Sequence, residues 1–274
     1  MINIGVLGPK GTFCDLALSK CMKQFDIKNV NVNYFSTISK VSKNIEKNDF
    51  SVLPLENSLD GYVQETLDVL LERNCHIICD LVIPVDFAFV SFEKNIKDIK
   101  KLYVQFKAYG QCLDFINCHN FEIYQTNNNV ESLERMMEDS NNTGAIIPIH
   151  LLENIKDKIN LKIEHIIDRE NNYTRFVLIG SGMEYLKEDL KCSLWICAKN
   201  DTPGTLSNAL KIFQEHQINL TCIMSRPTKN ELGTYNFYVE FMVKNKKEKL
   251  DKIISDLEKE KAFEAKLLGA YSRI

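Results

Sequence analysis

Short apolar runs and amphipathic stretches alternate along the first part of the chain. Apolar runs predict strands over 2–7, 30–35 and 50–55. Helices are predicted between them, after Phe13 and over 38–47 and 62–73, where apolar residues recur every three or four positions. This order of strand and helix predicts an α/β layer fold with a largely parallel sheet.

A second set of strands and helices follows and predicts a second lobe over about residues 81–160. Its strands are predicted over 82–91, 101–105, 122–126 and 144–148, with helices over 108–117, 130–138 and 150–154. A strand over 175–179 then returns to the first lobe. Two such lobes enclose a cleft, and sites in these sheets lie at the carboxyl ends of the strands.

The last part of the chain has the pattern of a separate small domain. A polar stretch over 182–191 marks the boundary, so the domains are predicted over 1–185 and 191–274. Strands over 194–198, 220–226, 235–243 and 265–271 alternate with helices over 204–214 and 246–259. That order, β-α-β-β-α-β, is typical of a ferredoxin-like fold.

Composition narrows the function classes. Among 274 residues, 45% are hydrophobic and 26% charged, which predicts a packed soluble core. The net charge of -3 gives no reason to expect affinity for nucleic acid or anionic membranes. No signal peptide or apolar run of membrane-spanning length is recognised. The nine cysteines are irregularly spaced, so we expect reduced thiols in a cytoplasmic protein and no metal site.

Two segments combine a strand's carboxyl end with the start of a helix. In the first, Gly8 to Phe13, the glycines free backbone N–H groups for a ligand, with Gly11 and Thr12 as candidates. The second holds Glu56, Asn57 and Ser58, where Asn57 and Ser58 have the alternative role of helix caps. For each segment taken alone, an ordinary strand–helix turn is the alternative.

A third segment, residues 171–176, includes Thr174, Arg175 and Phe176. Arginine offers a planar fork for a carboxylate, and threonine offers a hydroxyl donor. The alternative is that both residues simply begin a strand. The five histidines share no spacing, and no motif marks a nucleotide, flavin or pyridoxal site, so no cofactor is expected.

Taken in order, these segments resemble the prephenate dehydratase family. The matching motifs are Leu7–Gly8–Pro9–Lys10–Gly11–Thr12–Phe13, Leu53–Pro54–Leu55–Glu56–Asn57–Ser58, Ala108 to Cys112 and Asn172–Tyr173–Thr174–Arg175–Phe176. The tail is similar to the ACT domain of that family, through Pro203–Gly204–Thr205–Leu206, Ile218–Asn219–Leu220–Thr221 and Ser225–Arg226–Pro227. The resemblance covers nearly the whole chain in the family's order.

The resemblance implies a two-lobed catalytic domain like a periplasmic binding protein, which converts prephenate to phenylpyruvate with loss of water and carbon dioxide. Thr174 would assist departure of the ring hydroxyl, and Arg175 would hold a carboxylate or shape the site. It further implies inhibition by L-phenylalanine at ACT interfaces and a homodimer or homotetramer. The implied phenylalanine-binding residues are Gly204, Thr205, Leu206, Asn219, Leu220, Ser225, Arg226 and Pro227.

The chain departs from the family pattern mainly in the second lobe. Val104–Gln105–Phe106–Lys107 replaces Ser-His-Pro-Gln, and Asn127–Asn128 replaces Ser-Thr. Other departures are Phe87 for a His, Cys14 for a Ser and Met224 for a Glu. Asn127 and Asn128 retain hydrogen-bond donors for substrate, and Lys107 adds a positive charge. A non-catalytic paralogue that binds an aromatic metabolite, and an arogenate dehydratase, are therefore the alternatives to an active prephenate dehydratase.

Overall fold

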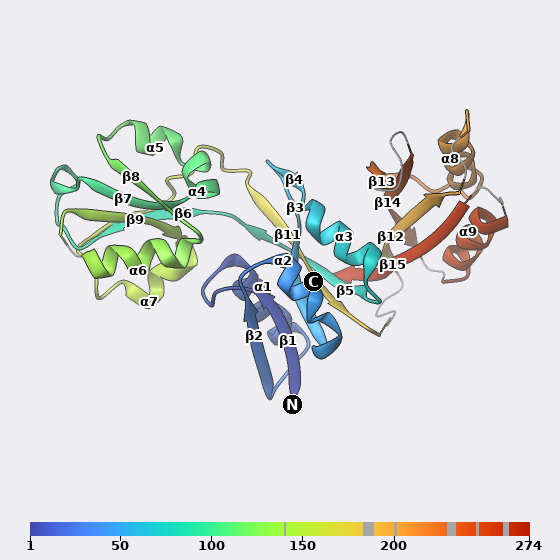
Figure 1. Ribbon diagram of the computed structural model, residues 1–274, viewed down its shortest axis with the longest axis horizontal. Helices are drawn as coiled ribbons and strands as arrows, with labels where there is room; N and C mark the ends of the chain where they lie inside the picture. Colours follow the sequence, from blue (N-terminus) through green and yellow to red (C-terminus); the bar gives the residue numbers. More distant parts are fainter. Residues whose placement is uncertain (140, 183–188, 200–201, 229–233, 245–246, 260–262) are drawn as a thin grey trace.

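The computed structural model describes residues 1–139, 141–182, 189–199, 202–228, 234–244, 247–259 and 263–274. The molecule has two lobes and a C-terminal domain arranged along its long axis, with the first lobe between the second lobe and the C-terminal domain (Figure 1). The expected division into 1–185 and 191–274 falls largely on residues 183–188, which lie outside the described residues.

The first lobe is a twisted sheet that has a helical layer on each face. Its strands are β1 (Ile2–Leu7), β2 (Val30–Phe35), β3 (Phe50–Asn57), β4 (Gly61–Tyr62), β5 (His76–Pro84) and β11 (Tyr173–Gly180). Helix α1 (Phe13–Gln24) packs against one face through Ala17, Leu18 and Cys21. Helices α2 (Ile38–Lys43) and α3 (Gln64–Glu72) pack against the other face through Val41, Leu67 and Leu70.

The second lobe is a five-stranded sheet in the order β10-β6-β9-β7-β8. Its strands are β6 (Phe87–Ser91), β7 (Lys101–Gln105), β8 (Glu122–Thr126), β9 (Thr143–Pro148) and β10 (Leu161–Ile163). Its helices are α4 (Phe106–Gln111), α5 (Leu113–Asn117), α6 (Asn129–Asp139) and α7 (Leu152–Ile155). The chain crosses between the lobes twice, from β5 to β6 and from β10 to β11.

One predicted strand is wrong. The apolar stretch predicted as a single strand over 82–91 is the end of β5 in one sheet and all of β6 in the other. β6 is wholly buried, whereas the end of β5 alternates between buried and exposed residues. Only two residues separate the two strands, so no turn signal marks the crossover. The predicted helix over 38–47 is likewise shorter, because α2 ends at Lys43 and a 3-10 turn follows over Ile45–Lys47.

The C-terminal domain has the predicted order β12 (Asp189–Ala198), α8 (Thr205–Glu215), β13 (Leu220–Pro227), β14 (Tyr235–Lys244), α9 (Lys247–Lys259) and β15 (Phe263–Arg273). One face of its sheet packs against both helices, through residues such as Phe213, Phe241 and Ile253. The other face packs against the first lobe, where Trp195 and Tyr238 meet Leu67 and Leu70 of α3.

The two domains also share one sheet. The end of β15 pairs in parallel with β5, with Ser272 beside Cys79 and Arg273 beside Asp80. The resulting sheet has ten strands and runs from β13 through β15 and β5 to β2. Within the described residues no helix is long and apolar enough to span a membrane.

Candidate active site

The topology of the first lobe gathers its candidate segments at one edge of the sheet. Strands β1 and β3 are parallel, and β11 runs antiparallel to both β3 and β5. The carboxyl ends of β1, β3 and β5 therefore lie at the same edge as the start of β11. The Gly8–Phe13 turn, the Glu56–Ser58 segment and Thr174 meet there, as the rule for parallel sheets predicts.

Asn57 fixes the hydroxyl group of Thr174. The Asn57 Oδ1 atom accepts hydrogen bonds from the backbone N–H groups of Leu59 and Asp60, at 2.9 and 3.0 Å, so its amide orientation is set. Its Nδ2 atom lies 2.9 Å from Thr174 Oγ1 and 2.9 Å from Asn172 Oδ1. An amide nitrogen can only donate, so the Thr174 oxygen accepts and its own proton is left to donate to a substrate.

Two further contacts lock this segment in place. The Ser58 hydroxyl donates to the Asn171 carbonyl at 3.0 Å and accepts from the Tyr173 N–H at 2.9 Å. The amide of Asn172 donates to Gln111 Oε1 of the second lobe at 2.9 Å. Ser58 and Asn57 therefore hold the start of β11 and do not cap α3, whose N-cap residue is Val63.

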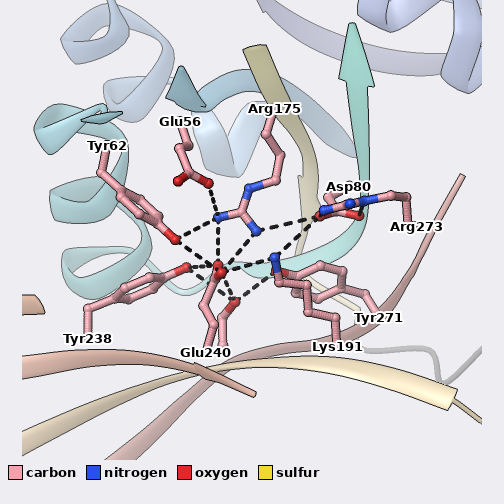
Figure 2. A network of polar contacts seen from close by, with 10 residues as sticks. Glu56, Tyr62, Asp80, Arg175, Lys191, Tyr238, Glu240, Tyr271 and Arg273 are labelled. Atoms are coloured by element: carbon pink, nitrogen blue, oxygen red, sulfur yellow. Dashed lines mark hydrogen bonds and ion pairs between the residues drawn. The ribbon is translucent and has the colours of Figure 1, made fainter. Parts of the chain in front are cut away.

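Arg175 lies in a different environment from its neighbour Thr174. Successive side chains of a strand point to opposite faces, and the Arg175 guanidinium is buried against the C-terminal domain, 4% exposed. It forms ion pairs with Glu240 at 2.7 Å and with Glu56 at 3.1 Å (Figure 2). Of the two expected roles of Arg175, this placement favours shaping the site. Substrate contacts by Arg175 and Glu56 stay predictions.

Phe176, the third residue of the signature, is a core residue. It is 2% exposed and packs in the cluster formed by α1 and the sheet. In this position it helps to hold β11 against α1. Its catalytic role also stays a prediction.

The Gly8–Phe13 turn reaches across to the second lobe. Gly11 has a φ of 92°, a left-handed conformation that favours glycine. Its N–H is already used by Asp15 Oδ2 at 2.9 Å, and the Thr12 hydroxyl donates to the Pro9 carbonyl at 3.0 Å. Thr12 is the N-cap residue of α1, but its side chain makes no capping hydrogen bond. Gly11 and Thr12 therefore lie at the expected edge, but the Gly11 N–H and the Thr12 hydroxyl are hydrogen-bonded within the turn and the start of α1.

His150 is a residue of this edge that sequence reasoning missed. Its Nε2 atom lies 3.0 Å from the Gly11 carbonyl, which can only accept, so Nε2 carries the proton. Its Nδ1 atom is buried and has no hydrogen-bond partner among the residues that the structure describes. Burial lowers the pKa of His150, which keeps the ring neutral near pH 7. The available signal was its position, two residues after the carboxyl end of β9.

The second-lobe candidates mostly serve helix starts. Asn128 Oδ1 accepts from the N–H groups of Val130 and Glu131, and so caps α6. Asn127 donates its side-chain amide to Glu131 at 2.8 Å. Their expected role in substrate binding stays a prediction. Lys107, in contrast, projects toward the first lobe and pairs with Asp60 at 2.8 Å.

The C-terminal candidates divide between two edges of their sheet. Gly204, with a φ of 94°, begins α8 together with the buried Thr205 and with Leu206. Strands β12 and β13 both run antiparallel to β14, so Ser225, Arg226 and Pro227 lie at the same edge as this turn. Asn219 and Leu220 lie at the opposite edge, where β13 begins. Arg226 also pairs with Asp68 of α3 at 2.8 Å.

In the described part of the chain, no cluster of His, Cys, Asp and Glu side chains has an arrangement that could hold a metal ion. The strongest polar grouping at the lobe edge is Asn57, Asn172, Thr174 and Gln111. This grouping supplies neutral hydrogen-bond donors and acceptors, which suits stabilisation of a leaving oxygen more than nucleophilic attack.

Comparison with known proteins identifies the family. The model of the family described as "Prephenate dehydratase" matches residues 4–184. The chain is 35% identical to the prephenate dehydratase of Methanocaldococcus jannaschii, over 96% of this chain and 95% of that protein. The chain belongs to the prephenate dehydratase family. The resemblance seen in the sequence motifs is confirmed, and with it the expected enzyme class, a carbon–oxygen lyase.

Solved structures confirm the fold over both domains. The prephenate dehydratase of Staphylococcus aureus superposes with a TM-score of 0.81 at 28% identity, over 98% of this chain and 100% of that one. That of Arthrobacter aurescens, solved in complex with L-Phe, gives a TM-score of 0.85 at 24% identity, over 99% and 90%. The predicted α/β fold with two lobes and a C-terminal ACT domain is therefore confirmed.

Proposed function

We propose that the protein converts prephenate to phenylpyruvate in L-phenylalanine biosynthesis, with Thr174 as the hydrogen-bond donor to the departing hydroxyl. Membership of the family supports the reaction. The proton of the Thr174 hydroxyl, which is left to donate to a substrate, supports the role of this residue. Asn57 accounts for that free proton, because it occupies the Thr174 oxygen as a donor.

The reaction needs little more than this donor and a binding site for a dianion. The bond between the ring and its carboxylate breaks to release carbon dioxide, and its electron pair enters the ring. The ring carbon–oxygen bond then breaks, and the hydroxide leaves as water after it gains a proton. The ring becomes aromatic, so the step is strongly downhill, and assistance at the leaving oxygen is the main requirement.

Lys107 is our candidate for a carboxylate of the substrate. Arg175 is buried among carboxylates, whereas Lys107 reaches from the second lobe to the first, where it pairs with Asp60. Its side chain is 61% exposed and its partner Asp60 is 43% exposed, so a bound dianion can displace or share this contact. The charge takes the place of the neutral residues usual in the family.

The deciding test is incubation of purified protein with prephenate, with phenylpyruvate followed by its absorbance in base. Arogenate is tested in parallel, because its ammonium group replaces the keto group. Formation of phenylpyruvate supports the proposal. Turnover of arogenate alone would reassign the substrate, and binding of both without turnover would favour a non-catalytic paralogue.

We also propose inhibition by L-phenylalanine at an interface between two ACT domains. The Arthrobacter aurescens protein was solved with L-Phe, and β13 is an edge strand of the shared sheet. If the β13 strands of two copies pair in antiparallel fashion, Asn219 of one copy comes close to Ser225 and Arg226 of the other. The two groups of candidate residues then form one site. The proposal includes a homodimer or homotetramer, measured by sedimentation.

A cytoplasmic location is part of the proposal. All nine cysteines are free, and those at 14, 21, 75, 79, 112 and 192 are buried. Burial raises the pKa of Cys14 to about 12 and that of Cys112 further, which leaves both thiols protonated and unreactive. Such thiols are typical of proteins from a reducing compartment.

A further inference from the structure

An ion cluster with a buried centre lies where the ACT sheet meets the signature strand β11. Its cations are Arg175, Lys191 and Arg273, and its carboxylates are Glu56, Asp80 and Glu240 (Figure 2). Three positive groups therefore face three negative ones. At its centre Asp80 is 0%, Glu240 2% and Arg175 4% exposed, so the two carboxylates are stabilised by their cationic partners and not by water.

Glu240 is the centre of this cluster, and it belongs to the ACT domain. Its two oxygens accept from Arg175 Nη2 at 2.7 Å and from Arg175 Nη1 at 3.0 Å, the bidentate geometry of a strong pair. Lys191 Nζ lies 3.0 Å from Glu240 Oε2. The hydroxyls of Tyr62 and Tyr238 also donate to this carboxylate, at 3.1 and 2.5 Å.

The electrostatics fix both partners in their charged forms. Burial alone would raise the pKa of Glu240, but the charge and hydrogen bonds of Arg175, with help from Lys191 and Tyr238, lower that pKa to about 2. Burial would similarly lower the pKa of Arg175, and Glu240 reverses this and raises it. Removal of Glu240 leaves Arg175 with a buried charge that has lost its best partner.

A displacement of the Arg175 backbone also displaces Thr174, because the two residues are adjacent in β11. Thr174 directly precedes Arg175 in β11, where its backbone is held between Asn57 of β3 and Ile83 of β5. The ladder between β11 and β3 shifts register immediately after Arg175, so the pairing with β3 is irregular next to Thr174. The Thr174–Asn57 hydrogen bond depends on the position of that backbone.

We propose that Glu240 is a positioning residue for the dehydratase reaction, acting from the ACT domain through Arg175 on the placement of Thr174. The inference rests on the proposed activity and goes beyond it, because it makes a residue outside the catalytic domain a determinant of kcat. Small displacements of a reacting group change rates steeply, by about a hundredfold for 1 Å.

The test compares two variants, each of which weakens a different set of contacts between the domains. Glu240→Gln keeps the shape of the side chain and removes its charge. Lys266→Met is the matched control. Lys266 of the ACT strand β15 donates hydrogen bonds to carbonyl groups at the end of α3, with its Nζ atom 2.6 Å from the Leu71 carbonyl oxygen. It makes no contact with Arg175. Steady-state kinetics with prephenate and thermal unfolding are measured for both.

We expect Glu240→Gln to lower kcat by roughly tenfold or more while KM stays within about threefold, since the substrate contacts are intact. Lys266→Met should keep kcat within about twofold of the wild type, even if its Tm falls as much as that of Glu240→Gln. Equal kcat losses in the two variants, or wild-type kcat in a folded Glu240→Gln protein, would overturn the positioning role.

If Glu240→Gln does not fold, Glu240→Asp decides, because it keeps the charge but shortens the side chain. Its kcat should fall at nearly constant KM, and an unchanged kcat would refute the proposal. Wild-type turnover separates the two levels of inference. An inactive wild type refutes the proposed activity, whereas an active wild type with an insensitive Glu240 refutes only the positioning role.

Discussion

Replacement of Thr174 by valine removes the hydroxyl and keeps the shape of the side chain. The hydroxyl accepts one hydrogen bond, from Asn57 Nδ2, and that amide retains acceptors at Asn172 Oδ1 and the Tyr173 carbonyl, at 2.9 and 3.1 Å. The net loss of one such bond is about 1 kcal/mol. The variant should therefore fold, with a Tm only a few degrees lower.

The effect on the reaction should be much larger. One well-placed donor to a developing negative charge contributes about 3 kcal/mol, or roughly a hundredfold to a thousandfold in kcat. Thr174→Val should show this loss in kcat with little change in KM, because the hydroxyl donates most strongly once the leaving oxygen gains charge. Initial rates of phenylpyruvate formation over a range of prephenate concentrations separate the two constants.

Thr174→Ser is the matched control, since it keeps the hydroxyl and removes only the methyl group. We expect its kcat within about tenfold of the wild type. A Thr174→Val protein with wild-type kcat would exclude the hydroxyl from the reaction. The orientation that Asn57 gives to the Thr174 hydroxyl would then play no part in catalysis.

The other predictions concern binding, stability and regulation. Lys107→Gln should raise KM about tenfold with little change in kcat, whereas Asp60→Asn should lower KM or leave it unchanged; kinetics at two salt concentrations checks both. Because the pKa of Glu240 falls from 4.5 to about 2 on folding, its contribution of about 3 kcal/mol is present above pH 4.5 and lost as the pH falls toward 2. Urea unfolding at pH 7, 4 and 3 should show this loss in the wild type and a shallower one in Glu240→Gln. Millimolar phenylalanine should lower activity and raise Tm, and Gly204→Val should abolish both responses, because valine strains the left-handed backbone there; no shift in the wild type would exclude phenylalanine as the effector.

The position of the candidate site was predictable because it depends on local pattern and one topological rule. The Gly8–Phe13 turn and the Glu56–Ser58 segment each follow a buried strand, and the carboxyl ends of parallel strands share an edge. The sequence also suggested a donor role for Thr174. It could not show that Asn57 orients this hydroxyl, because the two residues are separated by 117 positions.

The environment of Arg175 could not be predicted for the same reason. Its main partner, Glu240, is 65 residues away in another domain. Glu240 lies in the run Tyr238–Val239–Glu240–Phe241, which has the pattern of an ordinary strand with one polar position. A lone carboxylate among buried apolar residues is a signal that such a position has a charged partner, but the pattern does not say which one.

Asn127 and Asn128 illustrate a different limit. Asparagine at the start of a helix serves equally well as a cap or as a ligand-binding donor. The structure shows both residues bonded to the first turn of α6. Residue type and position were the same for both roles, so only the hydrogen-bond partners distinguish them.

The pairing of β15 with β5 bears on how this regulatory domain can be exchanged among enzymes. ACT domains are small folds whose helices and strands alone suggest a portable module. Here Leu268 and Tyr271 of β15 complete a core that includes Leu67 of α3 and Ile77 of β5. A chimera that imports a foreign ACT domain must therefore import a matching α3 surface and β5 edge, which ties the ancestry of the sensor to that of the enzyme it controls.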